Sequence, residues 1–348
     1  MARHKFLKRL LYTRSLYSLR ITGFTLIELL VAILIGSLIT FLLMGLVIDL
    51  AEANQRDSSK SQVQQDMQMA IDYMAQDLRE AVFVYNGQCL STGETAASGF
   101  RCPRLIDHLP ADLSSNGRTP VLAFWRTDPL PVGIAAFCGT NAQSLRDRTP
   151  NPADPISGVC LSGRTYSLIV YVLDTDVANQ WGGEAQVRRF RLARFRDNAT
   201  DATGTIPGYV DPLRDPSLTF QQWPLSKNNV SEQAARPNLT DSPAPVLLDF
   251  VSREGAFTQA PSCAGFVDPV QPPNPAPDPA KALSPTGATN PSFYVCVRGG
   301  GLDAVAGQNQ DVLLSVTGNL SGKPGYSRVG PKVDPIQTRV LVRGVLSK

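Results

Sequence analysis

Glu28 is the residue near the start of the chain whose type and position most clearly suggest chemistry. It is the only ionisable residue between Phe24 and Ile48, where every other residue is apolar or small. An acid inside a membrane costs on the order of 2.5–3.5 kcal/mol unless it is paired or reaches the headgroups. Two explanations stay open: Glu28 lies only four residues into the stretch and can snorkel, or it pairs with a positive group at the same depth.

A new N-terminus between Gly23 and Phe24 would supply such a positive group. An α-amino group is largely protonated below about pH 7.7–8. The geometry within one chain is poor for a pair between this amine and the Glu28 carboxylate. A neighbouring subunit, shifted along the helix axis, would offer its amine instead, and the role of Glu28 would then be intermolecular.

The element that must position Glu28 is a predicted membrane-spanning helix. Residues 24–48 would span roughly 37 Å as a helix, enough to cross a hydrocarbon core of about 30 Å. Residues 1–23 hold six Lys/Arg and no Asp or Glu, so they are expected to stay cytoplasmic and the rest to face outward. An ordinary secretory signal would have a shorter apolar core with its small-residue cleavage site behind it, not in front.

The segment Gly23-Phe24-Thr25-Leu26-Ile27-Glu28, followed by a long apolar helix, resembles the processing motif of type IV prepilins. The resemblance implies that a membrane prepilin peptidase removes the leader, residues 1–23, by cutting between Gly23 and Phe24. It also implies N-methylation of Phe24 and an assembly role for Glu28. The segment 24–50 would be an inner-membrane anchor first and the core of a periplasmic or cell-surface filament later. The expected partners are other pilins or pseudopilins and an inner-membrane assembly platform.

The helix is expected to continue from about Ala51 to Val84, in a segment bounded at 51–87. Its apolar residues recur at steps of three and four, which predicts an amphipathic helix packed on a head domain: Val63, Met67, Ala70, Ile71, Met74, Leu78, Ala81 and Val82. The stretch ending in Asp77-Leu78-Arg79-Glu80-Ala81 is similar to the large minor pilins and pseudopilins of the J/W type. Over about residues 24–90 it is similar to the hormogonium polysaccharide secretion pseudopilins of filamentous cyanobacteria, which adds exported polysaccharide as an expected partner.

The head, residues 88–348, is predicted to be rich in β-strands, which makes the fold α+β: a long N-terminal helix packed on an antiparallel sheet, with long Pro-rich loops as in type IV pilins. Strands are expected at Pro120–Trp125, Thr165–Asp174, Gln186–Phe195, Val246–Val251, Ser292–Arg298, Val312–Thr317 and Thr338–Leu346. Residues 257–291 contain nine of the 27 prolines and predict a long surface loop without a packed helix.

Basic residues are densest in the third predicted strand, at Arg188, Arg189, Arg191, Arg194 and Arg196. The preferred interpretation is a solvated strand edge that charge protects from further pairing. An anionic-polymer surface is the alternative, with polysaccharide as its ligand. The net charge of +3 is too small to indicate nucleic acid, and none is expected as a partner.

Six cysteines lie beyond the predicted membrane span, on the exported side: Cys89, Cys102, Cys138, Cys160, Cys263 and Cys296. An even number there favours disulfides, and the lack of a C-x-x-C pair argues against zinc and redox sites. Fifteen complete pairings are possible. The simplest joins neighbours in the sequence (89–102, 138–160 and 263–296), and the others stay open.

No catalytic residue, metal site or cofactor site is predicted. The chain has two histidines and no phosphate-binding glycine loop, nucleophile elbow or zinc-protease motif. A calcium loop at Asp197–Asp201 is a weak alternative to a solvated loop, because the EF-hand spacing is missing. Trp125, Trp181 and Trp223 could stack on sugars, but core burial is the better default.

Two classes of function therefore compete. The first, which we prefer, is a non-enzymatic subunit: a minor pilin or pseudopilin of a type IV pilus or type II secretion-like filament, serving polysaccharide secretion and surface motility. The second is an extracytoplasmic binding module or hydrolase that only uses a pilin-like membrane anchor. The size of the head favours a tip or initiation position, since a bulky head hinders tight helical packing.

Overall fold

The chain forms two compact units, residues 1–54 and residues 55–348. The computed structural model describes residues 23–95, 101–141, 155–177, 182–201, 204–214, 219–226, 228–256, 261–266, 278–301, 309–326 and 329–342. Residues 1–22 of the expected leader, the stretches 257–260 and 267–277 of the Pro-rich segment, and Trp181 lie outside this described part.

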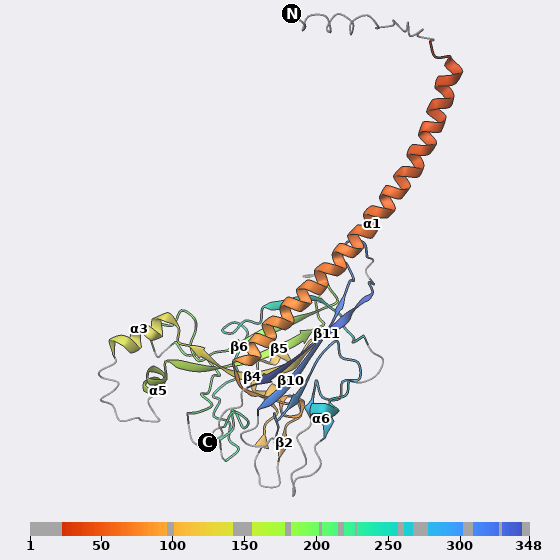
Figure 1. Cartoon of the computed structure of the whole chain (residues 1–348). Helices are drawn as coiled ribbons and strands as arrows, with labels where there is room; N and C mark the ends of the chain where they lie inside the picture. The colour runs from red at the N-terminus through yellow and green to blue at the C-terminus, as the bar shows by residue number, and fades with distance from the viewer. Residues whose placement is uncertain are drawn as a thin grey trace, which may run out of the picture. The chain divides into compact units, whose positions relative to one another are not determined.

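One continuous helix, α1 (Leu26–Arg79), contributes to both units. In the second unit its predicted apolar stripe is confirmed, because Val63, Met67, Ile71, Met74 and Leu78 are each fully buried. Figure 1 shows this part of α1 lying along the sheet. The spacing of three and four residues places these side chains on one face of the helix, and that face packs on the strands.

The expected end of this helix was wrong. Residues Ala81–Val84 form strand β1 instead, which pairs antiparallel with β4 (Arg118–Pro129). The chain then continues into a separate short helix, α2 (Gly87–Ser91), whose first turn is capped by Asn86. The apolar residues Ala81 and Val82 fit the helical stripe by spacing, but Val82, Phe83 and Val84 also favour a strand. Pairing with β4 decides between the two.

The head contains a nine-stranded antiparallel sheet, in the order β1-β4-β5-β6-β7-β10-β9-β8 with β11 paired to β10. Its further strands are β5 (Arg164–Asp174), β6 (Ala185–Leu192), β7 (Val246–Val251), β8 (Leu283–Ser284), β9 (Phe293–Arg298), β10 (Gln310–Asn319) and β11 (Lys332–Val342). A separate two-stranded sheet is formed by β2 (Glu94–Thr95) and β3 (Arg101–Cys102). Each of the seven predicted strands overlaps one of these strands, although residues 343–346 of the last prediction lie outside the described part. The α+β class with a long N-terminal helix and an antiparallel sheet is therefore confirmed.

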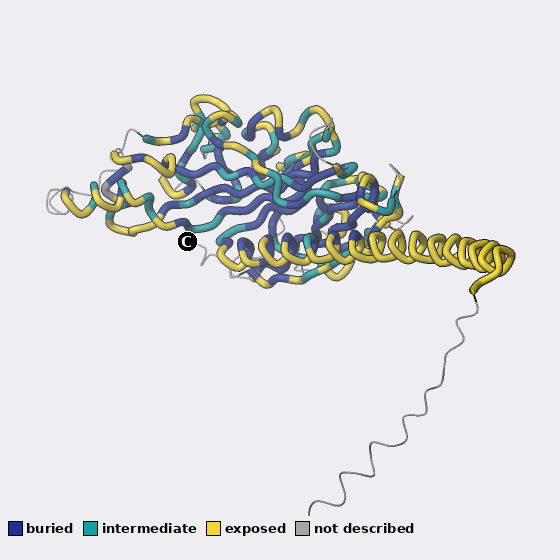
Figure 2. The backbone as a smooth tube through the Cα atoms, turned by 90° about the horizontal axis from the view of Figure 1, so that it is seen from above, coloured by how far each residue is buried: buried dark blue, intermediate teal, exposed yellow. Residues whose placement is uncertain are grey.

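Both faces of this sheet are covered in its β4–β6 part. Along β5, Ile169 and Tyr171 belong to the core that includes α1, whereas Leu168, Val170 and Val172 belong to a second core on the opposite face. Alternation along a strand sends neighbours to opposite faces, so two covered faces require the continuous apolar run that marks β5 in the sequence. Figure 2 shows the resulting buried strands in dark blue.

Short helices complete the head: α3 (Val132–Thr140), α5 (Pro155–Ser162), α6 (Pro279–Ala282) and the 3-10 turns Leu105–His108, Ala111–Leu113 and Ala264–Phe266. The expectation of no packed helix in 257–291 was wrong for α6, whose Ala282 is buried. Proline is tolerated in the first turn of a helix, and the Asp278 side chain caps α6 by accepting a hydrogen bond from the Ala280 N–H.

Candidate functional site

The six-residue motif at Gly23–Glu28 lies at the very start of α1. Gly23, Phe24 and Thr25 precede the helix and are exposed, and the Phe24 side chain is 79% exposed. No helical hydrogen bond holds the Gly23–Phe24 peptide bond within the described residues, since α1 begins at Leu26. The bond at which the sequence predicts cleavage is therefore outside regular structure and open to solvent.

Local capping explains why the helix begins where it does. The Thr25 hydroxyl accepts a hydrogen bond from the Glu28 N–H at 3.3 Å, and the Thr25 carbonyl accepts one from Leu29 N–H at 3.2 Å. Thr-x-x-Glu is the pattern of a capping box, in which the acid at the third helical position also favours the positive end of the helix dipole. In this cap it is the backbone N–H of Glu28 that donates to Thr25, while the Glu28 carboxylate lies near the positive end of the helix.

The apolar part of α1 is not covered by any of the residues that the structure describes. Every residue from Gly23 to Ser58 is exposed, including large side chains such as Leu26, Leu38 and Phe41. By length and composition, this is a helix able to cross a membrane. Exposed residues of the first unit are yellow in Figure 2. A continuous apolar surface of this length is stable only when lipid or other protein surrounds it.

The polar and small residues of this segment fit such surroundings. The Ser37 hydroxyl donates to the Leu34 carbonyl and the Thr40 hydroxyl to the Gly36 carbonyl, so neither is left unsatisfied. A Cβ at Gly36 or Gly45 would meet no atom within 4 Å. The packing of this chain alone therefore does not require glycine at these two positions.

Asp77, near the other end of α1, is the opposite case of a helical acid. It is 4% exposed and lies on the apolar stripe. Its carboxylate accepts from Arg126 Nη1 at 2.6 Å, Arg189 Nε at 2.8 Å and the Tyr171 hydroxyl at 2.6 Å. Burial and the neighbouring Asp77 carboxylate raise the pKa of Tyr171, because both oppose a phenolate. Tyr171 therefore stays protonated and donates to Asp77.

The charges continue across the sheet from this point. Arg126 also contacts Glu80 at 3.3 Å and Asp128 at 2.8 Å, and Arg191 contacts Asp128 at 2.9 Å and Asp197 at 3.0 Å. Alternating acids and arginines thus connect the end of α1 with β4 and β6. A buried charge is tolerated when it is paired and hydrogen-bonded in this way.

The interpretation of the basic strand as a solvated edge was wrong. β6, which holds Arg188, Arg189 and Arg191, is an internal strand between β5 and β7, and Arg194 and Arg196 follow it. Each of the five arginines has an acidic partner. The pairs are Arg188–Asp174, Arg189–Asp77, Arg191–Asp128, Arg194–Asp211 and Arg196–Asp241. Because carboxylates neutralise these arginines, they do not form the free basic surface that an anionic polymer would need.

Asp174 shows how the arginines act on an acid. Burial opposes its ionisation, but hydrogen bonds from Arg118 at 3.0 Å, from the Asp176 N–H and from Arg188 at 2.7 Å outweigh it. The pKa of Asp174 therefore lies below its ordinary value. Asp311 in β10 is likewise fully buried and contacts Arg298 and Arg339.

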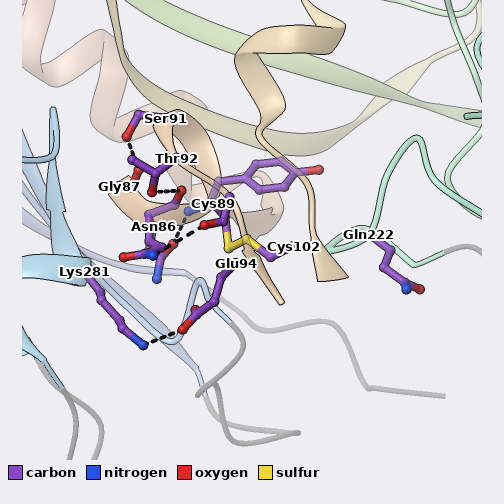
Figure 3. Close-up of a disulfide and its surroundings, with 12 residues drawn as sticks. Asn86, Gly87, Cys89, Ser91, Thr92, Glu94, Cys102, Gln222 and Lys281 are labelled. Carbon is purple, nitrogen blue, oxygen red and sulfur yellow. Dashed lines mark hydrogen bonds and ion pairs between the residues drawn. A yellow bond between two sulfur atoms is a disulfide. The ribbon is translucent and has the colours of Figure 1, made fainter. Parts of the chain in front are cut away.

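The six cysteines form three disulfides: Cys89–Cys102, Cys138–Cys160 and Cys263–Cys296. This is the pairing of neighbours in the sequence. Figure 3 shows Cys89–Cys102 beside the Asn86 cap, with the Glu94–Lys281 ion pair close by. This ion pair joins β2 to α6, and the disulfide joins α2 to β3, so both add cross-links to loops whose Cys89, Leu90 and Cys102 also pack in an apolar core.

The remaining predicted residues show no site. Trp125 and Trp223 are fully buried and contact each other edge to face, so neither offers a face to a sugar. In the calcium alternative, Asp197 is paired with Arg191. No group of three metal-ligating side chains occurs among the described residues. Burial lowers the pKa of His108, and a hydrogen bond involving Gln233 offsets this only in part.

The sequence analysis missed the Asp77 cluster. Asp77 follows Met74 by three residues and precedes Leu78, so it falls on the apolar stripe of the helix. An acid at a position expected to be buried, together with a strand of alternating arginines, is a signal that could have indicated the pairing of Asp77 with Arg189.

Comparison of the chain with protein families, curated proteins and solved structures returns no match.

Proposed function

We propose that this chain is a minor pilin or pseudopilin, a non-enzymatic subunit that assembles through α1 into a type IV pilus or type II secretion-like filament. The observation that carries the proposal is the start of α1: an exposed Gly23–Phe24 bond, an acid in the first turn, and an apolar surface that no described residue covers. In this proposal, lipid covers that surface before assembly and the helices of other subunits cover it afterwards.

The proposal assigns a role to each residue of the motif. A membrane prepilin peptidase cuts after Gly23, Phe24 becomes the methylated N-terminus, and Glu28 pairs with the amine of an adjacent subunit. The subunit waits in the inner membrane with its head outside the cytoplasm, and then enters a periplasmic or surface filament on an assembly platform. We further propose polysaccharide secretion and surface motility as the process it serves.

The Thr-x-x-Glu pattern of a capping box would by itself account for an acid or an amide at position 28, so the proposal needs evidence beyond this pattern. The cap satisfies the helix start, but it does not remove the cost of placing a carboxylate in an apolar environment. Capping also requires only Glu or Gln, with or without charge. A charge-specific requirement would therefore indicate pairing with a cation rather than local helix structure.

Mass spectrometry of the mature protein from its native membrane tests the processing step. We expect a chain that begins at Phe24 and carries one added methyl group on its amine. An intact Met1, or cleavage after residue 45, would contradict the proposal. Such a result would favour a membrane-anchored binding module or hydrolase that only shares this type of anchor.

A Glu28→Ala variant tests the assembly step separately. We expect processing at Gly23 to continue while the share of the variant in the filament fraction falls at least tenfold. Unchanged incorporation would refute the role of Glu28. Asp57→Asn is a matched control, because it removes the charge of an exposed acid on the same helix outside the apolar segment.

A further inference from the structure

α3 and α5, which we call the α3–α5 lobe, are apolar helices with little cover. Neither α3 (Val132–Thr140) nor α5 (Pro155–Ser162) contains a charged residue. α3 has no polar side chain before Thr140, yet Ile134 is its only buried residue. A helix that is hydrophobic on all sides is normally buried on all sides. The outer surface of α3 is therefore suited to contact with another molecule.

The lobe is firmly held, so its exposure does not come from a loose attachment. Cys138 of α3 is joined to Cys160 of α5. The two helices also share a small core with the segment that follows β6: Ile134, Ile156, Val159, Phe195 and Ala199. On top of this core, Val132 is 86% exposed and Leu161 is 65% exposed. These two side chains lie on a surface fixed by a disulfide and by packing.

The lobe lies at the end of the head where α1 finishes. α3 directly follows β4, and Arg126 of β4 contacts Asp77 and Glu80 in the last turns of α1. Within the head, α1 runs from Gln55 to Arg79, a length of about 36 Å, and the lobe lies near the Arg79 end. Figure 1 shows α3 and α5 beside each other at this edge of the sheet.

The chemistry of the lobe favours a protein surface over lipid. Helices that bind membrane surfaces combine an apolar face with Lys or Arg on the other face, usually with Trp or Phe anchors. α3 and α5 have no basic residue and no tryptophan, and the one phenylalanine, Phe137 of α3, packs against the core of the lobe. Ala135, Ala136 and Gly139 of α3 are exposed and small, so another backbone or flat apolar surface can approach closely.

The surface area of the lobe limits the kind of protein contact that it can make. Two helices of nine and eight residues present roughly 260 Å² of surface on one side, from a length of about 13 Å and a width of about 10 Å each. A stable complex usually buries about 800 Å² per partner. The lobe is therefore too small to hold two free molecules together. It becomes effective only between molecules already tethered side by side, where the effective concentration is high.

We propose that the α3–α5 lobe docks against an uncharged, apolar surface on the head of a neighbouring subunit in the same filament. This inference rests on the proposed function, since the filament supplies the tethering. The contact is specific to the head and separate from the packing of α1. It predicts that purified heads do not associate through the lobe at micromolar concentration, whereas subunits in one filament do.

Site-specific photo-crosslinking of the full chain in its native cells tests this inference. A benzophenone amino acid is placed at Val132, at Leu161 or, as a control, at Val230, which is 61% exposed elsewhere on the head. We expect at least tenfold more protein adduct from positions 132 and 161 than from 230. The second peptide, identified by mass spectrometry, is expected to come from a chain with its own processed apolar N-terminal helix. Equal yields, a lipid adduct, or a partner without such a helix would overturn the inference.

Charge variants supply an independent readout. Val132→Asp is expected to lower the Leu161 adduct at least fivefold without changing the melting temperature of the head, whereas Val230→Asp leaves the adduct unchanged. A normal yield with Val132→Asp would contradict docking. If Phe24 is methylated and Glu28 is required, but the lobe gives no adduct, the inference fails and the proposed function stands. If the leader is never removed, both fail.

Discussion

The two ends of α1 carry one acid each, Glu28 and Asp77, in contrasting environments. Asp77 is buried, and the same chain supplies two arginines and a tyrosine hydroxyl to its carboxylate. Glu28 is exposed, and the structure records only its backbone N–H in a hydrogen bond, to Thr25. The contrast extends to the apolar residues: those of the stripe from Val63 to Leu78 are buried, whereas those from Leu26 to Leu50 are exposed.

The comparison separates side-chain contacts that form within the folded chain from those that need another molecule. In the head, each helical side chain facing the sheet has a partner, and the acid there strengthens the contact between α1 and the strands. In the apolar segment, neither the side chains nor the acid depend on the rest of the chain. Changes near Asp77 should therefore affect stability, and changes near Glu28 should affect assembly.

Loss of the Asp77 charge is expected to have the largest effect on stability. Asp77→Asn leaves Arg126 and Arg189 beside a neutral group, which costs about 3 kcal/mol for a buried pair. The fluorescence of buried Trp125 and Trp223 reports unfolding of the full chain in detergent micelles. Asp72→Asn, on the exposed face of the same helix, is the control and should stay within about 0.5 kcal/mol. An equal effect of both changes would remove the special role of Asp77.

Removal of one leucine from each half of α1 sharpens the comparison. Leu78→Ala creates a cavity in the core and should lower the free energy of unfolding by about 2–5 kcal/mol. Leu38→Ala, at a residue that is 63% exposed, should leave the unfolding of the head unchanged in the same measurement. A comparable loss at Leu38 would mean that the apolar segment supports the head after all.

Two glycines provide a third test of the same contrast. A Cβ at Gly318 of β10 would lie 2.5 Å from the Met67 sulfur and 3.1 Å from a Val63 methyl. Gly318→Ala should therefore cost about 1–3 kcal/mol, as expected for overpacking. Gly36→Ala meets open space and should leave thermal unfolding of the head unchanged. Greater head stability in Gly318→Ala would show that α1 is not packed closely on β10.

The smallest expected effect is the pH dependence contributed by Asp174. Its pKa lies below the ordinary 3.8, so its stabilisation is complete above that pH and is lost as pH falls through the lower folded value. The difference in unfolding free energy between the native chain and Asp174→Asn should be constant from pH 5 to 7 and shrink below about pH 4. A difference that does not vary with pH would contradict this.

The sequence was a good guide to elements that local pattern determines. The strand at Thr165–Asp174 and the stripe from Val63 to Leu78 follow from periodicity and residue type, and both are present. The end of α1 could not be found in this way, because Ala81 and Val82 continue the helical spacing while pairing with β4 imposes a strand. α3 and α5 also had no predictive signal, since both are short and lack a polar face.

Partners of charged side chains were harder to predict than elements. Arg189 and Asp77 are 112 residues apart in sequence, and only the packing of α1 on β6 brings them together. Alternating arginines on a strand look the same whether they face solvent or buried acids. The distinction depends on a second element, which the pattern of one strand does not contain.

The most direct test of the account is the incorporation of Glu28→Gln into filaments. Glutamine keeps the shape and the capping ability of glutamate but removes the charge. The share of processed Glu28→Gln chain in the filament fraction, relative to the native chain, is the quantity to measure. We expect it to fall as far as in Glu28→Ala, at least tenfold, with Phe24 still methylated. Native-like incorporation of Glu28→Gln would show that assembly does not need the charge of Glu28, and would contradict the proposed charge pairing between subunits.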